Sequence, residues 1–179
     1  MDSPALVLHR YPYSETSWIV HWWTEAEGRV KTVAKGARRP KSALAGRLDL
    51  FFTARISWVP SRKSDLHVLR EADLENPRLH IRERYWNTMA AAYFTAWLDR
   101  VEGMEMGEAA ELYSLLTRAL DFLNDQPVTL KAVLHFERKL AETLGILQPG
   151  RPPEESLREL FGLIPSQRLS IVAALTSSG

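Results

Sequence analysis

The fold of this chain is decided by the stretch Ser17-Trp-Ile-Val-His-Trp-Trp-Thr24, Glu25-Ala-Glu-Gly28, Arg29-Val-Lys-Thr-Val-Ala-Lys35. Its first part is dense in β-branched and aromatic residues, which favour a strand. The second part is a tight turn. The third part alternates, so that small or apolar side chains would face inward while basic side chains face outward. The stretch therefore predicts two consecutive strands, the second of which displays positive charge.

Three more strands are predicted around these two. Ala5–His9 is a short apolar run before them, and Leu48–Val59 and Leu66–Glu71 follow them. Several short strands joined by turns are typical of a small barrel or sandwich, and the OB-type barrel is the five-stranded member of that group. We therefore expect residues 1–73 to form an OB-type β-barrel.

The pattern changes after Pro77, where apolar residues recur at three- and four-residue steps, as in amphipathic helices. The predicted helices span about residues 78–101, 112–123, 127–145, 154–161 and 166–175, with a connector at 148–153. Gly103 and Gly107 are expected to break the chain between the first two helices. The predicted fold class is α+β: an N-terminal five-stranded OB-type β-barrel followed by a C-terminal all-helical domain, residues 77–179.

A basic loop follows the second strand of the opening stretch. Between Gly28 and Leu48 the chain carries seven basic residues and no acidic one, and most lie in Gly36-Ala-Arg-Arg-Pro-Lys-Ser-Ala-Leu-Ala-Gly46. Glycine and proline disfavour helix and strand there, so the side chains should be displayed. Closely spaced positive charge suits a phosphate backbone, and a merely solvated loop is the alternative. The first candidates for DNA contacts are Arg38, Arg39 and Lys41, supported by Lys35, Arg29, Lys31 and Arg47.

Charge is divided unevenly along the 179 residues, although the net charge is only +1. Residues 1–70 hold 12 basic and 6 acidic side chains, whereas residues 71–179 hold 11 and 16. This asymmetry suggests two modules with different partners. The absence of cysteine excludes disulfides, cysteine-rich zinc sites and cysteine nucleophiles. The start of the chain lacks a signal-peptide pattern and no apolar run is long enough for a membrane span, so we expect a cytoplasmic protein without membrane contact.

Four motifs in the N-terminal half resemble the bacterial recombination mediator family RecO. They are Leu6-Val-Leu-His-Arg-Tyr-Pro-Tyr-Ser-Glu-Thr-Ser17, Thr24-Glu-Ala-Glu-Gly-Arg-Val30, Ala34-Lys-Gly-Ala-Arg-Arg-Pro-Lys-Ser42 and Leu44-Ala-Gly-Arg-Leu48. The similarity covers residues 5–71 well and continues more loosely to Gly145-Ile-Leu147. The basic loop in its strand context is its most specific part.

The resemblance implies an OB-fold and a helical domain that act in DNA repair and recombination without catalytic turnover. It also implies binding of single- and double-stranded DNA, annealing of complementary strands, and work with RecR and single-stranded-DNA-binding protein to load the RecA recombinase. No cofactor and no small-molecule substrate are implied.

Two features depart from the family. Gln148-Pro-Gly-Arg-Pro-Pro153 stands where many members carry a four-cysteine zinc module, so no metal is expected, and the chain looks short for the family. The resemblance further implies an apolar pocket in the helical domain for the acidic C-terminal tail of single-stranded-DNA-binding protein. Such a pocket needs a basic residue beside it, and no local motif selects among the candidates Arg82, Arg84, Arg100, Lys131, Arg138 and Lys139.

The aromatic residues of the barrel offer a second kind of candidate, because OB-folds stack bases on exposed rings. Trp23 is named as the possible base-stacking residue, although an aromatic in a short strand is more often part of the core. No nucleophile–base or metal constellation can be assembled, so an enzyme is the weakest class. The alternatives to a DNA-binding mediator are a protein-interaction adaptor with vestigial DNA binding and an RNA-binding OB-fold protein.

Overall fold

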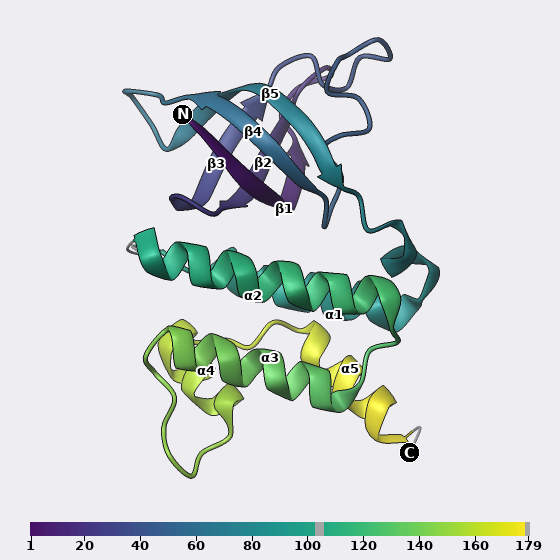
Figure 1. The fold of residues 1–179 in the computed structure, drawn as a ribbon, viewed down its shortest axis with the longest axis vertical. Helices are drawn as coiled ribbons and strands as arrows, with labels where there is room; N and C mark the ends of the chain where they lie inside the picture. Colours follow the sequence, from purple (N-terminus) through teal and green to yellow (C-terminus); the bar gives the residue numbers. More distant parts are fainter. Residues whose placement is uncertain (103–105, 178–179) are drawn as a thin grey trace. The chain divides into compact units, whose positions relative to one another are not determined.

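The computed structural model describes residues 1–102 and 106–177 (Figure 1). The strands are β1 (Asp2–Pro12), β2 (Trp18–Thr24), β3 (Gly28–Ala34), β4 (Thr53–Val59) and β5 (Leu66–Asn76). They are followed by the 3₁₀ helix η1 (Leu79–Glu83) and by α1 (Tyr85–Leu98), α2 (Met106–Asp125), α3 (Leu130–Thr143), α4 (Pro153–Phe161) and α5 (Gln167–Ser177). The chain divides into one compact unit of Met1–Pro77 with Val101–Tyr113, and a second of Arg78–Arg100 with the chain from Ser114 onward.

The five strands close into a barrel in the order β1-β2-β3-β5-β4 (Figure 1). All neighbours pair antiparallel except β3 and β5, which pair in parallel with Lys31 opposite Leu66 and Val33 opposite Val68. The predicted N-terminal OB-type barrel followed by helices is therefore confirmed.

The barrel interior is filled by side chains that alternate along the strands. Ala5, Val7, Val20, Trp22 and Ile56 belong to one buried cluster. A buried indole N–H needs an acceptor, and Trp22 Nε1 donates to Thr32 Oγ1 at 2.9 Å.

Part of the outer face of the barrel is also covered. Leu6 and Trp23 pair across β1 and β2, and both are fully buried. Trp23 Nε1 donates to the carbonyl oxygen of Ala109 at 3.0 Å, so the first turns of α2, around Ala109, supply the cover. Gly28 lies beneath this contact with a φ of +68°, and a Cβ there would lie 3.5 Å from the Trp23 ring and 3.6 Å from Ala109.

The helical unit is centred on α1, which is buried along most of its length. Asn87 links α1 to the end of α2 and to the loop after it. Its Nδ2 donates to the carbonyl oxygens of Leu123 at 2.6 Å and Gln126 at 2.8 Å, and its Oδ1 accepts from the amide of Val128 at 2.9 Å. All three of these polar backbone groups would lose their partner if the amide were removed.

A second buried polar group connects α1, α3, α4 and α5. Glu137 is fully buried, accepts from Tyr93 Oη at 2.6 Å, and forms a bidentate pair with Arg168 at 2.7 and 3.2 Å. Arg168 also contacts Glu154 at 3.1 Å. Burial and the Glu137 carboxylate raise the pKa of Tyr93, so its hydroxyl stays protonated and donates.

The structure corrects three predicted boundaries. Residues 48–52 form turns instead of the start of a strand, because Phe51 has a φ of +70° and the amide of Phe52 bonds back to the Asp49 carbonyl. The first predicted helix is divided into η1 and α1 by the extended backbone of Arg84. Gly107 lies inside α2, and Gly103 lies outside the described residues. None of the described helices is long and apolar enough to cross a membrane.

Candidate nucleic-acid interface

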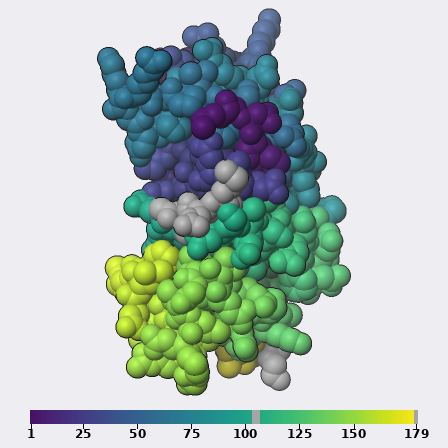
Figure 2. Space-filling view, turned by 60° about the vertical axis from the view of Figure 1, so that its left-hand side comes forward, coloured from purple at the N-terminus to yellow at the C-terminus, as the bar shows by residue number. Residues whose placement is uncertain are grey.

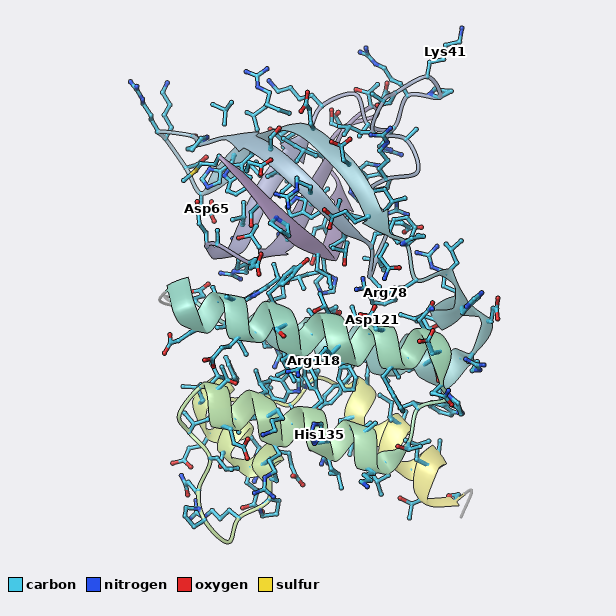
Figure 3. The ribbon with its side chains drawn as sticks, viewed as in Figure 1. Lys41, Asp65, Arg78, Arg118, Asp121 and His135 are labelled. Atoms are coloured by element: carbon cyan, nitrogen blue, oxygen red, sulfur yellow. The ribbon has the colours of Figure 1, made fainter. Side chains whose placement is uncertain are left out.

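The basic loop, residues 35–47, is a series of turns that forms the first part of the connection from β3 to β4. Gly36 begins it with a φ of +69°, a conformation that favours glycine. Ala37 is buried in the barrel core and Leu44 packs against it. These apolar anchors fix the base of the loop, whereas Lys41 points away from the barrel at its tip (Figure 3).

Three cations of the loop are displayed without an acidic partner. Lys35, Arg39 and Lys41 are exposed, and within residues 1–102 and 106–177 none of them forms an ion pair. In the space-filling view, side chains in the blue colour of residues 35–47 project from the barrel surface (Figure 2). Unpaired cations on a fixed loop can bind an anion without first breaking an ion pair.

Arg38 is held in place by local contacts. Its Nη1 donates to the Ser14 carbonyl oxygen at 2.6 Å, and its guanidinium carbon lies 4.9 Å from the centre of the Trp18 ring. Arg10 lies at the same distance from that ring and pairs with Asp49 at 3.1 Å. Sequence reasoning did not place Arg10 and Trp18 beside Arg38, because the cluster forms only when β1, β2 and the basic loop come together.

The remaining predicted cations are paired with carboxylates. Arg29 forms an ion pair with Glu102, Lys31 with Asp65 at 2.7 Å, and Arg47 with Asp73 at 3.1 Å. The hydrogen bond and charge of Lys31 hold the pKa of Asp65 below its usual value, so the Asp65 carboxylate stays ionised to lower pH than a free aspartate. Within the described residues, Lys35, Arg38, Arg39 and Lys41 of the loop form no ion pair, whereas Arg29, Lys31 and the loop residue Arg47 are partly neutralised.

The base-stacking prediction for Trp23 was wrong. The side chain faces outward from the barrel, as the alternation indicates, but α2 covers it at Ala109 and leaves no exposed ring. A ring that is fully buried and hydrogen-bonded cannot accept a base. The sequence contains no local signal for this cover, which comes from residues more than 80 positions away.

The helical unit contains an apolar pocket of about 690 Å³ between α1, α2 and α3. Phe94, Leu115, Phe122 and Phe136 supply apolar lining, and no acidic residue belongs to the described lining. Its basic lining residues are Arg118, Lys131, His135 and Lys139. Arg118 and His135 lie on α2 and α3 (Figure 3). Of the six basic residues considered from sequence, only Lys131 and Lys139 line this pocket.

Metal-binding geometry is absent from the described part of the chain. Across residues 1–102 and 106–177, no three or more His, Asp or Glu side chains gather so that they could hold a metal ion.

Comparison with known proteins gives one consistent result. The family model for the N-terminal part of recombination protein O matches residues 1–78. The chain is 34% identical to the DNA repair protein RecO of Nitrosospira multiformis over 143 residues, which cover 79% of this chain and 57% of that protein. It is 32% identical to the DNA repair protein RecO of Idiomarina loihiensis over 145 residues, which cover 81% of this chain and 61% of that protein. It is 49% identical to the DNA repair protein RecO of Burkholderia pseudomallei over 72 residues, which cover 40% of this chain and 26% of that protein. The chain thus spans at most about three fifths of these relatives.

Proposed function

This chain belongs to the RecO family of DNA repair proteins, and we propose that it binds single- and double-stranded DNA through its basic loop. The observation that carries the proposal is the set of exposed cations Lys35, Arg39 and Lys41, which form no ion pair in the described part of the chain, beside the fixed Arg38. Arg29, Lys31 and Arg47 are supporting contacts, since each must share its charge with a carboxylate.

The chemistry of such a site suits strand annealing without catalysis. Phosphate contacts do not depend on base identity, so they hold two strands near each other while base pairing selects the complement. A recombination mediator of this kind promotes annealing and RecA loading together with RecR. We assign DNA binding to the barrel, residues 1–73, and protein partners to the helices, residues 77–179.

Strand annealing tests this proposal. Wild type is expected to accelerate the pairing of two complementary DNA oligonucleotides. The acceleration by the variant Lys35→Glu/Arg39→Glu should be about tenfold smaller, because two attractive phosphate contacts become repulsive. The measurement is the time course of fluorescence quenching between labelled strands.

Two controls separate the competing functions. RNA oligonucleotides of the same sequence should not bind more tightly than DNA; clear preference for RNA favours an RNA-binding OB-fold protein. Weak DNA binding that never saturates, with no acceleration of annealing, favours a protein-interaction adaptor.

We propose that the helical pocket receives the acidic C-terminal tail of single-stranded-DNA-binding protein. The support is its chemistry: apolar walls would take apolar side chains, and Arg118, Lys131 and Lys139 would attract carboxylates.

A labelled peptide with the sequence of that tail is expected to bind about tenfold more weakly to Arg118→Glu/Lys131→Glu than to wild type, because two attractive charges become repulsive. Fluorescence anisotropy measures the affinity. Arg158→Glu, an exposed change on α4 outside the pocket, is the control. Equal loss in control and pocket variants would show general attraction of an acidic peptide instead of a defined site.

A further inference from the structure

We propose that unpaired DNA bases stack on Tyr11 and Tyr13, which form an aromatic platform beside the basic loop. This inference rests on the proposed DNA binding and adds the residues that distinguish single strands from duplex. It replaces Trp23, which is fully buried.

The two tyrosines are the large aromatic side chains that the barrel exposes. Tyr11 is 45% exposed and Tyr13 is 59% exposed, whereas Trp22, Trp23 and Trp58 are at most 2% exposed. Tyr11 lies at the end of β1 and Tyr13 begins the turn that leads to β2. An exposed ring face can accept any base, since every base has a π-face.

Hydrogen bonds fix this turn against the basic loop. The amide of Arg38 donates to the Thr16 carbonyl oxygen at 2.9 Å, and the amide of Gly36 donates to Ser17 Oγ at 3.3 Å. The Arg38 guanidinium donates to the Ser14 carbonyl oxygen, as described above, and the backbone amide of Tyr13 closes the turn by donating to the Ser17 carbonyl oxygen at 3.0 Å. The tyrosines therefore lie on a segment that is attached directly to the phosphate-binding candidates.

Neighbouring rings hold Tyr11 in a defined orientation. Its ring centre lies 5.2 Å from that of His21 in an edge arrangement and 6.0 Å from that of His9. His21 pairs across the sheet with Lys31, so aromatic rings and a cation share this face. A ring already held by packing loses little conformational freedom when a base stacks on it.

The ligand of this platform is single-stranded DNA. A single strand can present its bases to the rings while the loop cations contact its phosphates. In duplex the bases are paired and stacked inside the helix, so only the phosphate contacts remain available.

The test compares Tyr11→Ala/Tyr13→Ala with wild type on three probes: a thymidine oligomer, a duplex of equal length, and an abasic oligomer of equal length. The thymidine oligomer should bind about a hundredfold more weakly to the variant, or about tenfold for each ring, because the stacked bases lose their platform. Duplex and abasic affinities should be unchanged. Tyr11→Phe/Tyr13→Phe keeps the ring faces and should restore the thymidine affinity.

Tyr85→Ala is the matched control, because Tyr85 is 67% exposed but lies on α1. Equal losses on all three probes would overturn the platform, since they would show that the substitutions disturb the basic loop. Unchanged thymidine affinity would overturn it as well, while salt-dependent binding by wild type would leave the proposed function standing. Failure of wild type to bind any probe would instead defeat the proposed function itself.

Discussion

Replacing Arg38, Arg39 and Lys41 together by Glu should weaken the binding of single-stranded DNA about a hundredfold at low ionic strength. Each of the three side chains is exposed on the basic loop, and together they convert three attractive charges into three repulsive ones. Phosphate contacts supply most of the affinity in binding that is independent of sequence, so their loss acts on every DNA alike. Anisotropy of a labelled oligonucleotide measures the effect.

Reversing three charges elsewhere on the barrel distinguishes the effect of the loop from the effect of net charge. Arg62, Lys63 and Arg70 are also exposed, but they lie on the turn before β5 and on β5 itself. Their replacement by Glu changes the net charge equally and should cost much less affinity. Equal losses in the two variants would mean that overall charge, and not the loop, attracts DNA.

The second large effect concerns stability. Arg168→Ala should lower the free energy of unfolding of the helical unit by about 4 kcal/mol, because it leaves the buried Glu137 carboxylate without a compensating positive charge. The Glu137 side chain has no exposed surface and that of Arg168 is 14% exposed, so the pair is shielded from water in the native protein. Urea denaturation followed by helical circular dichroism measures the change.

The double change Glu137→Leu/Arg168→Leu is the control, since it removes both charges together. It should be less destabilising than Arg168→Ala alone, because no buried charge remains unpaired. A double variant that is less stable than the single one would show that the pair itself, and not the stranded charge, dominates. DNA binding by the barrel should be the same in both variants.

Periodicity sufficed to predict the barrel and helices, because alternation and the three-to-four-residue step are local properties of sequence. It failed at residues 48–52, where Leu48 and Phe52 are buried like strand residues although the backbone turns at Phe51. A buried turn and a buried strand give the same pattern of apolar residues in the sequence there. The division of the first helix at Arg84 was equally invisible, since the apolar spacing continues across it.

Only the part of the candidate site that is marked by a local density of basic residues could be predicted from the sequence. The loop cations are marked by their density, but pairing of Arg29, Lys31 and Arg47 with acids depends on contacts between distant residues. The same holds for Trp23, which α2 covers at Ala109. Tyr11 and Tyr13 are exposed at the end of β1 and in the turn after it, but the aromatic pattern of the sequence pointed to Trp23 instead.

The most direct test of DNA binding by the basic loop is the salt dependence of the affinity for single-stranded DNA. Four loop cations in contact with phosphates give a slope of about −3 for log K against log salt concentration, and Arg38→Glu/Arg39→Glu/Lys41→Glu should reduce its magnitude by about 2. A steep slope for wild type and a shallow one for the variant would support the loop as the phosphate site. Equal slopes would contradict it.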